Sequence, residues 1–361
     1  MSKCLLRKIT ATALLGCAFL ASLPALAQGA KVAPQSEELK QLIAKAQKEG
    51  QINLVGSSTT WNAPIKELNR RMNEKYGTTI QIRFVAGASM PQIASRLISE
   101  AKVGQPAFTD IFYGADSHTA RMAETGSFAT FPWDRLVEGY QKEMVPFGKG
   151  ELLVDAAAYV AIYNTKQVKK EDLPRDLDDL LNPKWKGRIM IPIYNNWVEG
   201  YLLNVGMDKL SKLEGWVDKI KAQQPAFARY GETTERVASG EFHFALNDGF
   251  EDLVELQAKG ALIAALPDFP TKRVFYHYVG VPKTAVNPNA AALFSVFMLS
   301  PEGQQIFYKH SRLASHLGQG SPMKQILVDL GNPKWPGIDV FLNPRPEIRR
   351  LEEKMKTAFG L

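Results

Sequence analysis

Short loops of glycine, serine and threonine follow several of the strands that the sequence predicts. The first loop spans residues 56–60, where small or polar residues stand in a row between a strand and an amphipathic helix. Backbone N–H groups at a helix N-terminus are unpaired and partly positive, so such loops suit carboxylate, phosphate or sulfate groups. Helix capping is the structural alternative for each residue. The candidate binding residues of this kind are Ser57, Ser58, Thr59, Gly87, Ser89 and Thr233.

Aromatic and acidic residues stand in other loops of the same type. Tyr194, Asn195 and Trp197 follow a predicted strand, and their rings could form one wall of a binding site, although core packing is the commoner role of an aromatic side chain. Carboxylates in the loops favour a ligand with an amine, whereas helix N-termini favour an anion, so the sign of the ligand's charge stays open. The acidic candidates are Asp116, Glu232 and Asp248.

The reactive groups that an enzyme needs do not converge in a motif. The histidines form no H-E-x-x-H pair, and the sequence has no G-x-S-x-G elbow and no Walker loop. Ser321 and Lys324 match S-x-x-K, a short pattern whose companion motifs are absent. We therefore predict a protein that is not an enzyme and that uses no metal and no cofactor.

The N-terminus has the pattern of a secretory signal peptide. Basic Lys3, Arg7 and Lys8 precede an apolar run over residues 9–23, and small residues at 25–27 predict cleavage after Ala27. A membrane anchor and a lipoprotein site at Cys17 are the alternatives. Without the three basic residues, the chain has 41 basic and 37 acidic residues, a net charge of +4. This mild excess predicts no nucleic-acid partner, and export predicts a periplasmic protein.

Predicted strands alternate with amphipathic helices along the rest of the chain, a pattern typical of doubly wound parallel α/β sheets. The 361 residues are enough for two such units. Ligands of these sheets bind beyond the carboxyl ends of the strands, which is where the polar loops stand. Strands are expected at residues 52–55, 79–85, 110–113, 158–163, 189–193, 226–229, 242–246 and 275–281.

Several strings resemble the type 2 periplasmic solute-binding proteins of ABC transporters, extracellular solute-binding protein family 1, in the branch with the ferric-iron receptors. The strings are AIYNTK at 161–166, LLNPKWKGR at 180–188 and NPNAAALFSVFMLSPEGQ at 287–304. The resemblance implies two doubly wound α/β lobes joined by hinge strands, closure on a small-molecule solute, and an inner-membrane ABC permease as partner. It places lobe 1 at residues 28–157 plus 280–361 and lobe 2 at 158–279, in a protein expected to be a monomer.

The sequence departs from the ferric receptors at their metal ligands. Those proteins carry adjacent tyrosines after the penultimate strand of lobe 2, and the matching segment here, ALNDGFED at 245–252, has none. The run Tyr276-His277-Tyr278 lies in an expected hinge strand and is interpreted as structural. We therefore predict a small polar organic or oxyanion solute. A ferric-iron receptor and a ligand-binding partner of a sensor remain the alternatives, and a hydrolase is disfavoured.

Overall fold

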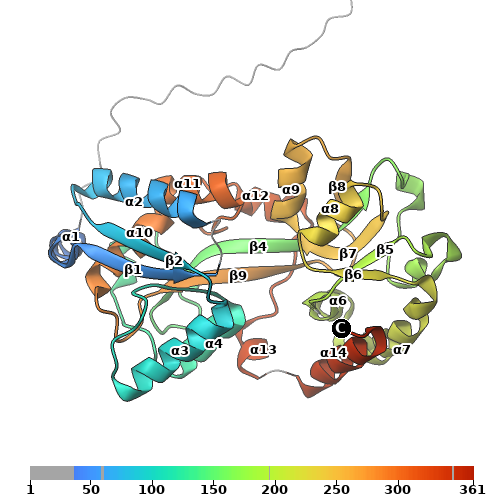
Figure 1. Ribbon diagram of the computed structural model, residues 1–361, viewed down its shortest axis with the longest axis horizontal. Coiled ribbons are helices and arrows are strands. Elements are labelled where there is room, and N and C mark those ends of the chain that lie inside the picture. The colour runs from blue at the N-terminus through green and yellow to red at the C-terminus, as the bar shows by residue number, and fades with distance from the viewer. Residues whose placement is uncertain (1–35, 58–60, 195, 344) are drawn as a thin grey trace, which may run out of the picture. The chain divides into compact units, whose positions relative to one another are not determined.

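The computed structural model describes residues 36–57, 61–194, 196–343 and 345–361 (Figure 1). The predicted signal segment lies outside these residues, as do three candidate site residues, Ser58, Thr59 and Asn195. Among the described helices, none combines the length and the apolar character that a membrane span requires.

The first strands and helices follow the expected strand–loop–helix order. Strand β1 (Gln51–Gly56) pairs in parallel with β2 (Gln81–Ala86), and the sequence predicted both strands to within about two residues. Helix α1 (Glu37–Glu49) precedes β1; Ser36 caps its start, and Gly50 ends it with a φ of 66°. The helices that follow the two strands are α2 (Asn62–Tyr76) and α3 (Met90–Val103).

A second sheet has seven strands in the order β3-β9-β4-β7-β5-β6, with β8 beside β4. The long strand β4 pairs antiparallel with β9, and Figure 1 shows these two strands running through the middle of the described chain. Strand β3 begins two residues later than predicted; before it, the carboxylate of Asp110 accepts hydrogen bonds from the backbone N–H groups of Asn53, Val286 and Asn287. The bounds are β3 (Phe112–Ala115), β4 (Glu151–Asn164), β5 (Ile189–Pro192), β6 (Ala226–Ala228), β7 (Phe244–Gly249), β8 (Ile263–Leu266) and β9 (Arg273–Gly280).

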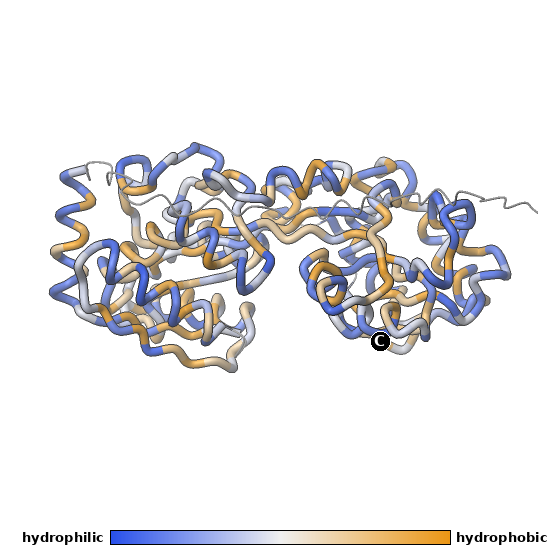
Figure 2. The backbone as a smooth tube through the Cα atoms, turned by 90° about the horizontal axis from the view of Figure 1, so that it is seen from above, coloured by the Kyte–Doolittle hydropathy of each residue, from blue (hydrophilic) through white to orange (hydrophobic). Residues whose placement is uncertain are grey.

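The remaining helices pack against the strands or against one another, and Figure 2 shows hydrophilic and hydrophobic residues interspersed along the backbone. Each of β5, β6 and β7 is followed by a helix, as expected of a doubly wound unit. The bounds are α4 (Asp116–Glu124), α5 (Trp133–Leu136), α6 (Asn196–Val205), α7 (Leu210–Ile220), α8 (Glu232–Ala238), α9 (Phe250–Ala258), α10 (Pro288–Leu299), α11 (Pro301–Ser311), α12 (Met323–Asp329), α13 (Ile338–Leu342) and α14 (Pro346–Phe359).

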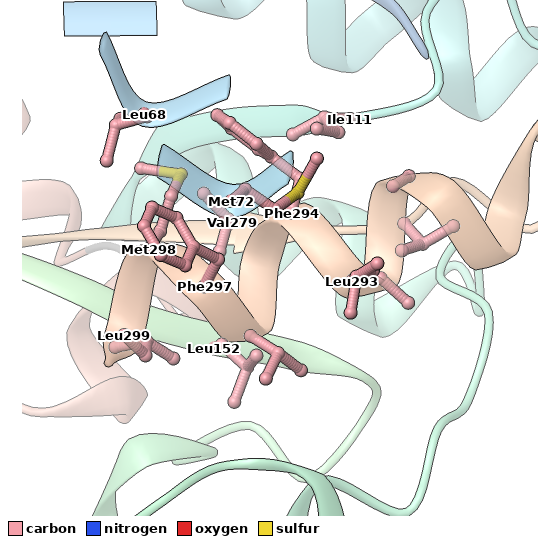
Figure 3. Packing of buried hydrophobic residues seen from close by; sticks show 14 of the residues in the cluster. Leu68, Met72, Ile111, Leu152, Val279, Leu293, Phe294, Phe297, Met298 and Leu299 are labelled. Atoms are coloured by element: carbon pink, nitrogen blue, oxygen red, sulfur yellow. The ribbon is translucent and has the colours of Figure 1, made fainter. Parts of the chain in front are cut away.

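One apolar cluster is built around α10, which is buried on all sides (Figure 3). Phe294, Phe297 and Met298 of this helix pack with Leu68 and Met72 of α2. Ser300 ends α10 and caps α11 by accepting from the N–H of Gly303. A Cβ at Gly303 would lie 2.0 Å from the carbonyl oxygen of Phe297, so only glycine fits this junction of the two helices.

A second apolar cluster contains Trp185, Trp197 and Trp216. Helix α14 adds Ile348, Leu351 and Met355 to this cluster, because its single apolar face packs against α6 and α7. The sequence assigned residues 280–361 to lobe 1, whereas the packing of α14 joins this helix to the residues of predicted lobe 2. The lobe boundaries as a whole stay a prediction.

Candidate functional site

Alternate residues of β9 place three contrasting side chains on one face of the sheet. Arg273, Phe275 and His277 are two residues apart, and side chains at this spacing share a face. We call it the odd face of β9. The β4 residues that pair with them, in the same order, are Tyr159, Ala157 and Asp155. Directly paired residues also share a face, so β4 and β9 together carry a continuous polar and aromatic row.

At one end of the odd face, His277 and Asp155 form a closed hydrogen-bonded group with Tyr113. Asp155 is fully buried; it accepts from the Tyr113 hydroxyl at 2.8 Å and bonds His277 Nδ1 at 2.7 Å. Burial alone lowers the pKa of His277, but the Asp155 carboxylate outweighs it, so the pKa is raised. The Tyr113 ring stacks on His277 and contacts Trp61, the residue after the 56–60 loop, at 4.5 Å between ring centroids. This end of the odd face therefore adjoins Trp61, the residue before α2.

At the other end, Arg273 is only 1% exposed. Its Nη1 donates to a carboxylate oxygen of Glu199 and to the carbonyl oxygen of Asn196, and its guanidinium lies 3.8 Å above the centre of the Phe275 ring. Its Nε and Nη2 atoms are buried and have no hydrogen-bond partner among the described residues. A buried N–H donor without a hydrogen-bond partner raises the free energy of the folded state, and Arg273 has two of them.

Aromatic rings fill the space beside Arg273. The Tyr159 ring contacts Phe275 at 5.0 Å and Tyr230 at 4.7 Å, and Tyr230 contacts Tyr194 at 4.9 Å between centroids. Tyr194 is 42% exposed, so the row of rings reaches from the strands to the surface. We call Tyr159, Tyr194, Tyr230 and Phe275 the aromatic cluster.

Three carboxyl groups gather where β7 meets α9. Asp248 is fully buried and accepts from the Thr234 hydroxyl at 2.7 Å and from the N–H groups of Gly249 and Gly231. A Cβ at Gly249 would lie 2.7 Å from Glu251 Oε1, so glycine there leaves room for that carboxylate. Oε2 of Glu251 is buried without a partner among the described residues. Together with Asp252, these groups form what we call the acidic trio.

The acidic trio is short of positive charge. Desolvation, with repulsion between its members, raises the pKa of Asp248 to about 7 and that of Glu251 to about 8, and desolvation raises that of Asp252 to about 6. Within the described part of the chain, no ion pair includes any of the three. The same charges raise the pKa of Tyr159, whose burial is the largest cause, so the trio lies beside the aromatic cluster.

The opposite side of β9, which we call the even face, also contains a buried carboxylate. Asp116 accepts from the Tyr276 N–H at 3.1 Å, the Tyr278 hydroxyl at 3.0 Å and Trp335 Nε1 at 2.9 Å. Burial raises the pKa of Asp116 to about 6. Its side chain ties β9 to α4 and to the segment around Trp335, which is a structural role. This predicted site residue therefore lies on the opposite face of β9 from Arg273 and His277.

The structure brings some of the predicted residues together and separates others. Asp248 and Tyr194 belong to the acidic trio and the aromatic cluster, and Thr233 lies between them in sequence at the start of α8, where its hydroxyl donates to the carbonyl of Arg229. Glu232 is exposed beside it. Trp197 is fully buried against Trp216, so we leave it out of the binding surface.

The predicted site residues in the loops after β1 and β2 are exposed. Ser57 is exposed after β1, and Gly87, with a φ of 132°, is exposed after β2. The N–H and hydroxyl of Ser89 both donate to Gln92 Oε1, which matches the helix-capping alternative. Nothing in these contacts assigns a ligand to the three residues.

Sequence reasoning missed several residues of this region. Arg273, Glu251, Tyr159 and Tyr230 were not among the candidates, because each stands in or near a strand rather than in a glycine- or serine-rich loop. One signal was available: an arginine two residues before the predicted hinge strand at 275–281, followed by a run of aromatic residues, has to be paired if it is buried. Among the described residues, no three histidine, cysteine or carboxylate side chains are placed to hold a metal ion.

Comparisons with known proteins agree with this architecture. A family model described as bacterial extracellular solute-binding protein matches residues 107–343. The major ferric iron-binding protein of Neisseria meningitidis is 22% identical over 258 residues, which are 68% of this chain and 77% of that protein. Iron-bound HitA of Pseudomonas aeruginosa is 22% identical with a TM-score of 0.66, over 84% of this chain and 99% of HitA.

A third similar structure, AgtB of A. tumefaciens R10 in complex with agropinic acid, has 11% identity and a TM-score of 0.63, over 86% of this chain and 99% of AgtB. At such identities the structures show the fold, that of type 2 periplasmic binding proteins with two α/β lobes. This confirms the predicted fold class. Because the family model also spans more than half of the sequence, the chain belongs to the bacterial extracellular solute-binding proteins, which are transport proteins of ABC systems rather than enzymes.

Proposed function

We propose that this protein is the periplasmic receptor of an ABC importer and that its solute is a small organic molecule with a protonated amine. The acidic trio carries the proposal: three carboxyl groups that form no ion pair among the described residues stand next to the aromatic cluster. In this role the protein binds its solute as a monomer and delivers it to an inner-membrane permease.

The electrostatics of the acidic trio favour a cation. Like charges that are shielded from water and have no counter-ion hold protons above their ordinary pKa values. An ammonium group placed among them would restore the ionised forms and would satisfy the free Oε2 of Glu251. An anion in the same place would add a further like charge to the ionised carboxylates and would keep the trio protonated.

The aromatic cluster supports the same class of solute. A cation near the face of a tyrosine ring is attracted by the electrons of the ring, and the attraction is strongest where water is excluded. Tyr230 and Tyr159 lie beside the trio, and Tyr194 lies at the exposed end of the cluster. Acids and rings together therefore suit an amine better than they suit an oxyanion alone.

Ferric iron is the second candidate, because the relatives from Neisseria meningitidis and Pseudomonas aeruginosa are ferric iron-binding or iron-bound proteins. Against it stands the segment after β7, where Asp248, Glu251 and Asp252 take the place of the adjacent tyrosines expected from the resemblance. Carboxylates alone are less selective for a hard trivalent ion than phenolates are, so we rank the amine first.

A thermal-shift screen tests the proposed function. The purified protein is melted with polyamines, alkylamines, amino acids, carboxylates, sugar phosphates and ferric citrate. A ligand present at about 100 times its Kd stabilises the protein by about 2.7 kcal/mol, which is a clear shift. We expect the stabilising compounds to contain an amine. Stabilisation only by anions without an amine, or a visible tyrosinate-to-iron band on adding ferric citrate, would overturn the proposal.

Two variants on α9 locate the amine. Glu251→Gln removes a charge of the acidic trio, and we expect it to weaken binding of an amine hit at least tenfold. Glu255→Gln is the matched control on the same helix, because Glu255 is exposed and pairs with Lys259. Equal effects of the two substitutions would place the amine elsewhere.

A further inference from the structure

The guanidinium of Arg273 has one free edge. Nη1 is occupied by Glu199 and by the carbonyl oxygen of Asn196, and one flat side is covered by Phe275. The two atoms without partners, Nε and Nη2, are neighbours on the remaining edge of the planar group. Two parallel N–H donors in this arrangement match the two oxygens of a carboxylate or a phosphonate. We infer that Arg273 binds an oxyanion group of the same solute, so that the solute is a zwitterion with an ammonium group and a carboxylate or phosphonate group.

This inference rests on the proposed function, because it adds a second group to the solute that the acidic trio binds. Glu199 already pairs with the positive charge of Arg273. The free edge therefore lacks hydrogen-bond acceptors rather than a counter-ion. Each buried donor left without a partner carries an uncompensated desolvation cost. An oxyanion that accepts from both Nε and Nη2 would remove this desolvation cost, and it would do so only in the bound state. The binding site would gain affinity for that ligand as a result.

The register of the sheet places the two subsites a short distance apart. Arg273 pairs with Tyr159, and Tyr159 pairs with Gly249, where a Cβ would lie 2.7 Å from Glu251 Oε1. Glu251 is therefore the member of the acidic trio on this face, because Asp248 pairs with Val160, whose side chain starts on the opposite face. Neighbouring strands are about 4.8 Å apart, so the backbones at Arg273 and Gly249 are separated by about 10 Å. Tyr159 and Tyr230 lie between the two ends. A solute with its two charged groups a few bonds apart fits this arrangement.

The route to the free edge passes the aromatic cluster. Arg273 is buried, so a solute reaches it only after neighbouring side chains move. The hydroxyl of Tyr230 is also buried; it forms no hydrogen bond of normal geometry, although the Asn196 side chain is close enough to oppose the rise in its pKa. Tyr194 contacts Tyr230 and is partly exposed, so it is the ring with room to move when the solute enters.

Calorimetry with matched probes tests the inference. The zwitterions are β-alanine, γ-aminobutyrate and aminomethylphosphonate; propylamine and butyrate each lack one of the two groups. We expect one zwitterion or more to bind at least tenfold more tightly than propylamine, a difference of about 1.4 kcal/mol. Amines that bind as tightly as the zwitterions, or zwitterions that do not bind at all, would overturn the inference.

Two variants identify the residue responsible. Arg273→Lys keeps the positive charge but loses the two parallel donors, so we expect the affinity for the zwitterion to fall at least tenfold and that for propylamine to stay within twofold. Glu199→Gln leaves the free edge intact and removes the neutralising charge, so we expect zwitterion affinity to rise or stay unchanged. General damage to the site would weaken binding in both variants, and melting curves show whether each one folds.

The outcomes separate this inference from the proposed function. Butyrate binding that is lost in Arg273→Lys, without any binding of amines, would keep the anion subsite and reject the amine-binding receptor. Amine binding that depends on Glu251 but not on Arg273 would keep the receptor and reject the zwitterion.

Discussion

Asp116 on the even face of β9 and Arg273 on the odd face are both buried, but their hydrogen bonds differ. On the even face, Asp116 has three donors directed at it, and each of them is at hydrogen-bonding distance. On the odd face, Arg273 has two buried N–H groups without partners, and the nearby Glu251 has a buried oxygen without one. A buried polar group whose partners are all present within the chain holds the fold together, whereas one that lacks partners is available to a ligand. Burial alone therefore does not identify a binding residue; unpaired hydrogen-bonding atoms beside other candidate binding groups, as at Arg273 and Glu251, point to one.

The largest expected effect is on the even face. Asp116→Ala would leave the Tyr278 hydroxyl, the Trp335 N–H and a backbone N–H without their acceptor, and we expect the free energy of unfolding to fall by about 3 kcal/mol. Urea unfolding measures it. Glu232→Ala is the control, since Glu232 is an exposed acid in the first turn of α8, and its removal should cost less than about 1 kcal/mol. A loss below 1 kcal/mol in Asp116→Ala would remove the distinction between the faces.

On the odd face we expect the opposite pattern. Glu251→Gln removes a desolvated carboxyl that is repelled by Asp248 and Asp252, so the stability of the free protein should stay the same or increase. Binding of an amine-bearing solute should fall by a factor of 10 to 100, because an ion pair shielded from water is lost. Melting curves and calorimetry of the same preparation give both numbers. A clear loss of stability would show that Glu251 holds the fold, as Asp116 does.

The pH dependence should distinguish the free protein from the bound one. The pKa values of Asp248 and Glu251 are raised to about 7 and about 8, so the folded state holds protons that the unfolded chain releases. The free energy of unfolding of the free protein should therefore fall as the pH rises from about 5 to about 8. Amine binding needs the ionised forms, so affinity should rise about tenfold from pH 6 to 8.5, with proton release at pH 7 in calorimetry. Affinity that falls over this range would contradict the acidic trio as the amine site.

The smallest expected effect concerns the exposed end of the aromatic cluster. Tyr194→Ala removes a ring that is 42% exposed, so stability should change by less than about 0.5 kcal/mol. Affinity for the solute should fall about threefold to tenfold, because the ring contacts Tyr230 beside the site. Tyr194→Phe keeps the ring and should bind like the unchanged protein. Loss of affinity in both variants would mean that the hydroxyl, and not the ring, contacts the solute.

Most of the fold followed from patterns that are local in the sequence. The strands expected at residues 52–55 and 79–85 are β1 and β2, to within about two residues. The packing of α14 was not predictable in the same way. Its apolar face is visible in the sequence, but nothing local says which cluster it covers, and the structure places it beside Trp216.

The candidate site was predictable only in part for the same reason. Polar loops after strands led to Asp248, Thr233 and Tyr194, because a ligand site of an α/β sheet lies at the ends of its strands. The same reasoning included Asp116 and Trp197, whose partners lie in distant segments: Asp116 bonds Trp335, and Trp197 packs on Trp216. Neither contact can be predicted from the residues that stand next to Asp116 or Trp197 in the sequence.

The sequence by itself determined that this chain alternates strands and helices, that its loops are polar, and that it lacks the tyrosine pair of the ferric receptors. Only the tertiary structure decided which buried polar groups are satisfied. Hydrogen bonds between side chains depend on distances of about 3 Å between residues that stand far apart in the sequence. The pairing of β9 with β4, and of β4 with β7, is what places Arg273 near Glu251 and leaves both with atoms that no part of the described chain satisfies.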